Sequence, residues 1–197
     1  MTLKHLGMSA SLAYASLAFT ALASQQATAQ TAPTALPAVS PIATLDVPRY
    51  LGTWYEIAKF PNRFQAKCAA NTRAQYTSQA DGSVQVRNSC STAEGSATEA
   101  LGKAVQMGGA NSPKLKVRFA PEWLSWLPWV WGDYWVIDLD ADYQLAAVSD
   151  AKREYLWVLS RTPQLNPKAY EALLERLKAQ HFDVQKLDRT PQTNPQR

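Results

Sequence analysis

Few side chains of this 197-residue chain have the types and spacing that catalysis requires. Its two histidines, His5 and His181, lie far apart in the sequence, so a metal site built on paired histidines is not expected. The chain has no Gly-x-Ser-x-Gly motif, no phosphate-binding loop and no plausible pairing of a histidine with a serine or cysteine nucleophile. We therefore expect a protein that is not an enzyme and that needs no metal and no cofactor.

Glu56 is the carboxylate whose surroundings indicate a role in binding. It lies in the run from Gly52 to Phe60, where aromatic and β-branched residues alternate with polar ones as in a strand. A carboxylate that faces an apolar interior is costly unless it is paired or protonated. We expect Glu56 to anchor the polar group of a ligand or to belong to a buried network. If the strand has the other register, Glu56 faces solvent instead.

Residues 1–29 have the pattern of a secretory signal peptide. Lys4 and His5 give a short basic start, an apolar stretch follows to Ala23, and Ala27-Thr28-Ala29 resembles a cleavage site. A retained membrane anchor is the alternative. We expect export to the periplasm or secretion, without lipid attachment at an N-terminal cysteine, because no cysteine lies near this segment.

The two cysteines, Cys68 and Cys90, indicate a disulfide, because an even number of cysteines in an exported protein usually pairs. Closing a loop of this length would stabilise the fold by roughly 3 kcal/mol. Two free buried thiols are the alternative.

The composition fits one domain and gives no support for nucleic-acid binding. Hydrophobic residues make up 46% of the chain, enough for one core of ordinary size. The formal net charge of +4 is too small to indicate nucleic acid, but it is compatible with weak attraction to anionic lipid head groups. We expect a flexible Ala/Thr/Pro-rich linker over residues 30–44, a folded domain over 45–188 and a loose tail over 189–197.

Eight runs of strand-forming residues predict an all-β domain. They cover residues 53–60, 71–79, 84–91, 98–107, 115–119, 134–140, 143–148 and 155–160. Asp81-Gly82 predicts a two-residue hairpin turn between the second run and the third. A short helical turn over 46–50, a helix from the Asn166 cap to about Gln180 and a last short strand over 184–187 complete the set. Short connections make neighbouring strands antiparallel, which gives a sandwich or a closed barrel with room for one small ligand.

Four tryptophans fall between the fifth and sixth runs, at Trp123, Trp126, Trp129 and Trp131. Two prolines interrupt this segment, which is too short to span a membrane. Tryptophans on an exposed loop are costly unless they pack, dimerise or touch lipid. Two outcomes follow: a lip that shields the cavity and dips into a membrane interface, or a loop that folds down and plugs the barrel.

Three stretches together resemble the lipocalin family, and within it the bacterial outer-membrane lipocalins related to apolipoprotein D. They are Gly52-Thr53-Trp54-Tyr55-Glu56, residues 134–143 (YWVIDLDADY) and residues 155–163 (YLWVLSRTP), in matching order and spacing. The resemblance spans residues 46–187. It implies an eight-stranded antiparallel up-and-down β-barrel with one C-terminal α-helix packed outside. The usual members carry a lipoprotein cysteine, which this sequence lacks, so outer-membrane anchoring does not carry over.

The resemblance also implies roles for individual residues. Trp54, after Gly52, would close the floor of the barrel with Arg161 packed across its indole, and the disulfide would tie the first mouth loop to the rim. Counting alternate residues from Trp54 and Arg161, with weaker inferences for the middle strands, gives a set of side chains expected inside the barrel. These candidate ligand contacts are Glu56, Ala58, Phe60, Tyr76, Val84, Val86, Phe119, Tyr134, Trp157 and Leu159. Tyr134 is expected at the mouth end of its strand.

The function that this resemblance implies is reversible binding of a small apolar or amphipathic ligand. We expect the protein to carry or store a fatty acid or lysophospholipid in the cell envelope, as a monomer or a homodimer. The alternative is a structural envelope protein with a filled barrel that contacts membrane through the tryptophan-rich loop. An open cavity would favour the first function, and a filled barrel the second.

Overall fold

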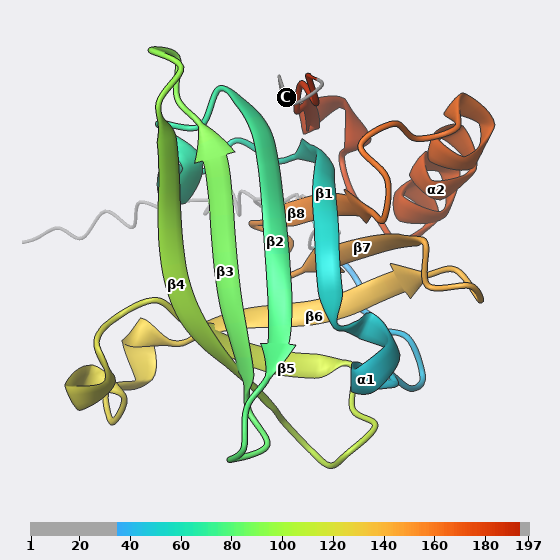
Figure 1. Ribbon diagram of the computed structural model, residues 1–197. Coiled ribbons are helices and arrows are strands. Elements are labelled where there is room, and N and C mark those ends of the chain that lie inside the picture. Colours follow the sequence, from blue (N-terminus) through green and yellow to red (C-terminus); the bar gives the residue numbers. More distant parts are fainter. Residues whose placement is uncertain (1–34, 194–197) are drawn as a thin grey trace, which may run out of the picture. The chain divides into compact units, whose positions relative to one another are not determined.

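Each strand is followed directly by the next through a turn or a loop without an intervening α-helix, and this connectivity produces a closed barrel in the computed structural model, which describes residues 35–193 (Figure 1). The strands are β1 (Gly52–Lys59), β2 (Ala70–Ser78), β3 (Val84–Ser91), β4 (Ala97–Gln106), β5 (Lys114–Arg118), β6 (Gly132–Leu139), β7 (Leu145–Ser149) and β8 (Leu156–Ser160). Each pairs antiparallel with its neighbours in sequence, and β1 pairs with both β2 and β8. The expected eight-stranded barrel is therefore confirmed, with one extra short strand, β9 (Asp188–Arg189), beside β1.

Two α-helices and four 3₁₀ turns accompany the strands within residues 35–193. The helices are α1 (Val47–Tyr50) and α2 (Pro167–Ala179), and the 3₁₀ turns are η1 (Arg63–Gln65), η2 (Glu122–Leu124), η3 (Pro128–Val130) and η4 (Val184–Lys186). Both helices begin at a side-chain cap. Asp46 accepts from the Arg49 amide, and Asn166, the predicted cap, accepts from the Lys168 amide. The strand predicted over 184–187 is wrong, because that stretch forms η4 and β9 begins after it.

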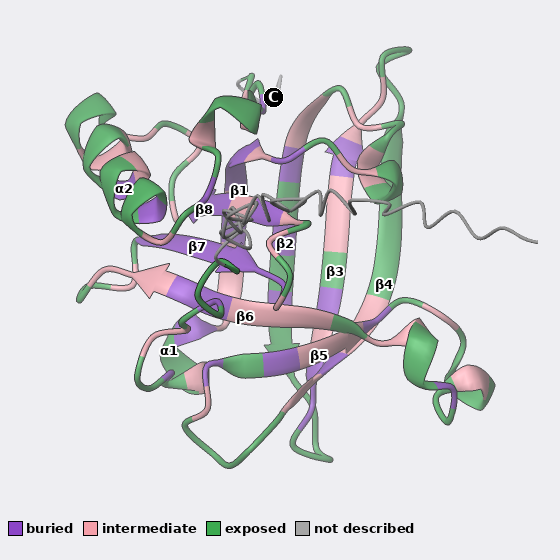
Figure 2. Cartoon of the chain, turned by 180° about the vertical axis from the view of Figure 1, so that it is seen from behind, coloured by how far each residue is buried: buried purple, intermediate pink, exposed green. Residues whose placement is uncertain are grey.

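Apolar side chains are buried on the inner face of the barrel and on the part of its outer face formed by β1, β6, β7 and β8. The inner face forms one cluster that includes Trp54, Tyr76, Val136 and Leu159. The outer face of β1, β6, β7 and β8 packs against α2 through a second cluster that includes Leu173 and Leu177 (Figure 2). We call the end of the barrel beside α1 the floor, and the opposite end the mouth.

A bulge in β1 changes which residues face inward near the mouth. Glu56 pairs with Leu159, but the next pair is Ala58 with Val158, so the register shifts by one residue between them. Ala58 and Phe60 consequently pack in the outer cluster under α2. Their predicted place inside the barrel is wrong, and Lys59, opposite Trp157, takes the inward position instead.

The chain on either side of the eight strands is more ordered than the sequence suggested. Residues 36–44 are not a free linker, because Val39 is buried and the Ile42 amide donates to the Val136 carbonyl at 3.0 Å. Residues 189–193 are not a loose tail, because the Thr190 amide donates to the Ile57 carbonyl at 3.0 Å. The predicted signal peptide and residues 194–197 lie outside the described residues.

Cys68 and Cys90 form a disulfide, with their Cα atoms 5.5 Å apart. The register explains how they meet. The register of β2 against β3 shifts between Ala70 and Arg73, where Asn71 has a φ of 55°. Because of this bulge Ala70 lies opposite Ser91, and the loop before β2 lies over the end of β3.

The turn between β2 and β3 is longer than the two residues expected, since the Gln79 amide donates to the Ser83 carbonyl.

Candidate functional site

The barrel floor is closed by Trp54, which is fully buried. Its indole Nε1 donates to the Tyr50 carbonyl at 2.8 Å, and the guanidinium carbon of Arg161 lies 4.0 Å from the ring centroid. Burial lowers the pKa of Arg161 from its usual value. The structure thus places both residues as the resemblance implied, and no ligand can pass through this end.

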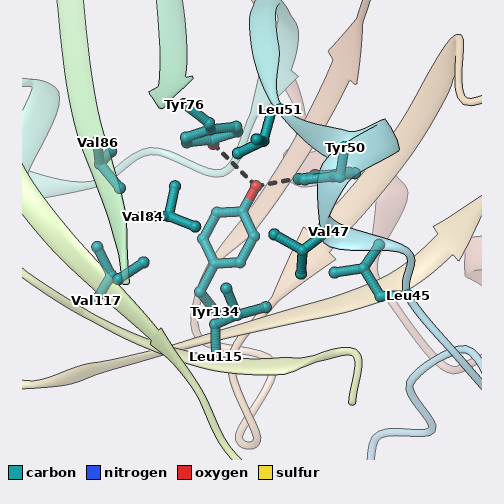
Figure 3. A pocket seen from close by; sticks show the side chains of 11 residues that line it. Leu45, Val47, Tyr50, Leu51, Tyr76, Val84, Val86, Leu115, Val117 and Tyr134 are labelled. Atoms are coloured by element: carbon teal, nitrogen blue, oxygen red, sulfur yellow. Dashed lines mark hydrogen bonds between the residues drawn. The ribbon is translucent and has the colours of Figure 1, made fainter. Parts of the chain in front are cut away.

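A cluster of three tyrosines lies just above the floor (Figure 3). The hydroxyl of Tyr134 is 2.9 Å from those of both Tyr50 and Tyr76. Burial raises the pKa of Tyr76 to about 12 and those of Tyr50 and Tyr134 well above their usual value, so all three are neutral hydrogen-bonding groups at neutral pH. Tyr134 was expected at the mouth, but it opposes Leu115 and contacts Tyr50, so it belongs to the lower half.

Little free space remains around the tyrosine cluster. The cavity has a volume of about 20 Å³, close to the space that holds one water molecule. Four of the predicted ligand contacts line this cavity: Tyr76, Val84, Val86 and Tyr134. The other lining residues are Leu45, Val47, Tyr50, Leu51, Ala104, Leu115 and Val117. A fatty-acid chain does not fit in the lower half unless these side chains move.

Glu56 lies in the upper half and belongs to a buried network, which was one of the two roles expected for it. It is 2% exposed, its Oε1 accepts from the Thr190 hydroxyl at 2.6 Å and its Oε2 accepts from the Gln65 amide. Burial is the main cause of the raised pKa of Glu56, and these two hydrogen bonds oppose it. Gln65 also accepts from the indole of Trp157 at 2.9 Å, so η1 is tied to β1 and β8.

Lys59 and Trp157 face each other across β1 and β8 at the mouth end of this network. The Lys59 Nζ lies 3.8 Å from the Glu56 Oε1, and 15% of its side chain is exposed. Trp157 stacks on Tyr155 with ring centroids 5.7 Å apart and packs against the inner cluster, which also contains Leu159. The mouth half of the lumen therefore combines an aromatic surface with a partly exposed cation.

The barrel wall has an opening beside the mouth half of β4. Residues 97–101 are exposed on both faces, because β5 pairs only with residues 103–106. Thr98 and Ala100, opposite Cys90 and Asn88, belong to the inner face of the sheet, where solvent reaches them. Phe119 borders this opening: it is 44% exposed, and its ring lies so close to Gly102 that an added Cβ there would come within 2.7 Å.

The tryptophan-rich loop stands away from the barrel interior. Trp123, Trp126 and Trp129 are 74%, 75% and 77% exposed. Trp131 is half-buried, its indole donates to the Ser125 carbonyl at 2.8 Å, and Arg118 lies over its ring. The alternative in which these tryptophans plug the barrel is wrong, because Trp123, Trp126 and Trp129 are exposed to solvent and Trp131 packs within the loop and against Arg118.

The side chains of the upper lumen are suited to holding a ligand. Within residues 35–193, no group of three histidine, cysteine or acidic side chains is placed to hold a metal ion. Over the same range, no helix is both long and apolar enough to cross a membrane. The upper lumen has an aromatic wall, a cation and hydrogen-bonding side chains above an apolar floor.

A barrel closed at one end and open at the other defines a class of proteins that enclose one small ligand. The family model of the lipocalin-like domain matches residues 45–192, and the chain belongs to the lipocalin family. The resemblance seen in the three sequence stretches is thereby confirmed. Lipocalins generally bind small hydrophobic molecules.

Relatives of this chain come from plants, bacteria and animals. Temperature-induced lipocalin-1 of Arabidopsis thaliana is 43% identical over 157 residues, which cover 76% of this chain and 81% of the relative. The outer membrane lipoprotein Blc of Escherichia coli K12 is 36% identical over 155 residues, covering 78% and 83%. Apolipoprotein D of Mus musculus is 29% identical over 156 residues, covering 76% and 78%.

Solved structures share the fold at low sequence identity. Insecticyanin of Manduca sexta superposes with a TM-score of 0.63 at 20% identity, over 83% of this chain and 89% of its own. Apocrustacyanin C1 superposes with a TM-score of 0.60 at 15% identity, over 76% and 81%. At these identities the likeness concerns the fold alone.

Several site residues could not be found from the alternation pattern. Tyr50 lies in α1, outside the strands that were counted. Gln65 reaches Glu56 from η1, and Thr190 reaches it from the segment after β9. Lys59 was missed because of the β1 bulge. The adjacent apolar residues Ile57 and Ala58, which break the alternation between Glu56 and Lys59, were the one signal in the sequence for that bulge.

Proposed function

We propose that the barrel binds one small amphipathic or apolar molecule, such as a fatty acid or lysophospholipid, in the mouth half of its lumen. The observation that carries the proposal is the opening at β4, where inner-face residues Thr98 and Ala100 are exposed while the tryptophan loop leaves the mouth free. Membership of the lipocalin family supports it.

The floor cavity limits how deep such a ligand lies. With about 20 Å³ free around the tyrosine cluster, the alkyl chain occupies the region bordered by Trp157 and Phe119, above Tyr134. A small shift of the tyrosine cluster would deepen the site. We therefore expect affinity to depend on the length of the alkyl chain. Short acyl chains would bind without rearrangement of the tyrosine cluster.

The cellular setting forms part of the same proposal. The signal-like residues 1–29 and the Cys68–Cys90 disulfide both favour an oxidising compartment outside the cytoplasm. Among the relatives, Blc is named an outer membrane lipoprotein. We place the protein in the periplasm or outside the cell, where it carries or stores its ligand.

A steric block tests the position of the ligand. Ala100→Trp adds a large side chain to the exposed inner face of β4, and Leu101→Trp adds the same side chain to the outer face, where Leu101 is already 53% exposed. Calorimetric titration with dodecanoic acid and with lysophosphatidylcholine should give saturable binding of one ligand per barrel to wild type and to Leu101→Trp. Binding should be lost in Ala100→Trp. Equal binding by both variants would refute the proposed position.

A second candidate function, peripheral membrane contact, is favoured by the exposure of the loop tryptophans. Three indoles that are each about three-quarters exposed are costly in water, and tryptophan prefers the membrane interface. Co-sedimentation with anionic and neutral vesicles tests this contact. Wild type should sediment with vesicles and show blue-shifted emission, and the triple variant Trp123→Ser/Trp126→Ser/Trp129→Ser should do neither. Trp157→Phe is the matched control and should behave as wild type.

A further inference from the structure

The inner face of β1, β2 and β3 carries a polar side chain on each strand in the mouth half of the barrel. Lys59 faces inward opposite Trp157, and Asn88 faces inward opposite the inner-cluster residue Ala74. Thr72 precedes Ala74 by two residues, so it lies on the same face of β2. The lower half, in contrast, is lined by aliphatic side chains and neutral tyrosines.

These three side chains have unused hydrogen-bonding capacity. In the described part of the chain, the buried Thr72 Oγ1 and Asn88 Oδ1 have no hydrogen-bond partner, and Thr72 is 6% exposed. The Lys59 ammonium carries three donors, and its nearest carboxylate oxygen, on Glu56, is 3.8 Å away, beyond hydrogen-bond range. Buried polar atoms without a partner are rare and point to a missing water or ligand.

Glu56 does not satisfy Lys59 because its oxygens are already engaged. Thr190 and Gln65 donate to its two carboxylate oxygens, and its burial raises its pKa. The ammonium is thus held next to the lumen by the β1 bulge, while the carboxylate is directed into the network that fixes the C-terminal segment.

We propose that Lys59, Thr72 and Asn88 form a head-group site that selects ligands ending in an anionic oxygen group, a carboxylate or a phosphate. The inference rests on the proposed function, because the alkyl chain would occupy the lumen below. The ammonium and the threonine hydroxyl donate to the anionic oxygens. The Asn88 amide, which can present either its oxygen or its nitrogen, completes the shell with a ligand hydroxyl or a water.

Pairs of ligands that differ only in the head group test the selection. Dodecanoic acid is compared with dodecanol, and lysophosphatidic acid with the monoacylglycerol of the same chain, so that the two pairs separate carboxylate from phosphate. Hydrogen bonds to a charged group predict that wild type binds the anionic member at least about tenfold more tightly. The preferred pair identifies the head group.

Lys59→Met should reduce that preference to about twofold or less, because only the charge-assisted bonds are lost. Lys67→Met removes the same charge from an exposed position in the loop near the mouth and should keep the full preference. Lys59→Arg keeps the charge and should keep most of the preference for the anionic ligand. Thr72→Val, which preserves the shape of the side chain, should weaken binding of the anionic ligand more than binding of the neutral one. This variant tests the site even if Lys59→Met does not fold.

The outcomes separate the two proposals. If acid and alcohol bind wild type saturably and equally, or if the preference is the same in Lys59→Met and Lys67→Met, the head-group site is refuted and the proposed function stands. If no probe binds saturably to wild type, both fail.

Discussion

The guanidinium of Arg161 lies over the face of Trp54 and donates three hydrogen bonds to main-chain carbonyls around the floor. Its Nη2 reaches the Arg49 carbonyl at 2.8 Å, its Nη1 the Thr53 carbonyl at 3.0 Å and its Nε the Tyr143 carbonyl at 3.2 Å. One planar fork thus joins α1, β1 and the β6–β7 turn. Arg161 thereby ties together three separate segments of the floor.

Replacing Arg161 should therefore destabilise the whole barrel. Arg161→Met loses the cation–π contact and leaves three carbonyls without their donor, which predicts a loss of about 2–4 kcal/mol in the free energy of unfolding. Arg161→Lys keeps the charge but has no planar fork, so it should recover less than half of that loss. Urea unfolding followed by circular dichroism measures both. Full recovery by lysine would show that the charge alone matters.

The position of the Arg161 guanidinium over Trp54 also requires a glycine at position 52. Its φ of 94° is in the left-handed region, and an added Cβ would lie 3.3 Å from the Arg161 Nη1. Gly52→Ala should cost about 2–4 kcal/mol, the sum of backbone strain and the displaced guanidinium. Gly82→Ala is the matched control, because Gly82 has a similar φ of 78° but open space around it, and backbone strain alone predicts about 1 kcal/mol. Equal losses in urea unfolding would contradict the role of the contact.

The tyrosine cluster predicts a loss of stability in alkali. Burial raises the pKa of Tyr76 from about 10 to about 12, so above pH 10 the unfolded chain releases a proton that the folded chain keeps. Stability is thus unaffected below pH 10 and falls as the pH rises to 12, by about 3 kcal/mol for this residue. Unfolding measured from pH 8 to 11.5 should show a smaller decrease in Tyr76→Phe than in wild type. Parallel curves for the two proteins would argue against the buried phenol.

Thr190 should matter far more than its place near the C-terminus suggests. Its hydroxyl donates to the buried Glu56 carboxylate, and hydrogen bonds to charged groups contribute about 1.5–3 kcal/mol. Thr190→Val should lose that amount in chemical unfolding and raise the pKa of Glu56 further. Thr193→Val, which removes an exposed hydroxyl that bonds Asn71, should cost less than about 1 kcal/mol. The idea fails if both variants unfold at the same denaturant concentration.

The fold was predictable because its signals are local and repeated. Three motifs in register, antiparallel strands with short turns and the Asn166–Pro167 helix start each point to the same barrel. The same motifs predicted that Arg161 packs across Trp54 at the floor. Alternation within single strands also placed Tyr76, Val86 and Leu159 on the inner face, where the structure has them.

The upper site was only partly predictable, because it depends on irregular and long-range features. One extra residue in β1 reverses the facing of the side chains that follow it in the strand. Simple alternation therefore predicts Ala58 and Phe60 on the inner face and does not predict Lys59 there. One of the two hydrogen-bond donors to the Glu56 carboxylate is Thr190, 134 positions away in the sequence, and no periodicity connects them. The exposure of Trp123, Trp126 and Trp129 depends on the direction in which the tryptophan-rich loop leaves β5, and the composition of the loop does not specify that direction.

Quenching of Trp157 by a brominated fatty acid tests ligand binding in the mouth half most directly. Bromine quenches an indole only at close range, and Trp157 is the tryptophan that lines this part of the lumen. We expect saturable quenching of wild type with one ligand per barrel, a large loss of that quenching in Trp157→Phe and no loss in Trp126→Phe, which changes an exposed lip residue. Quenching that persists in Trp157→Phe but disappears in Trp126→Phe would place the ligand at the lip and contradict binding within the barrel.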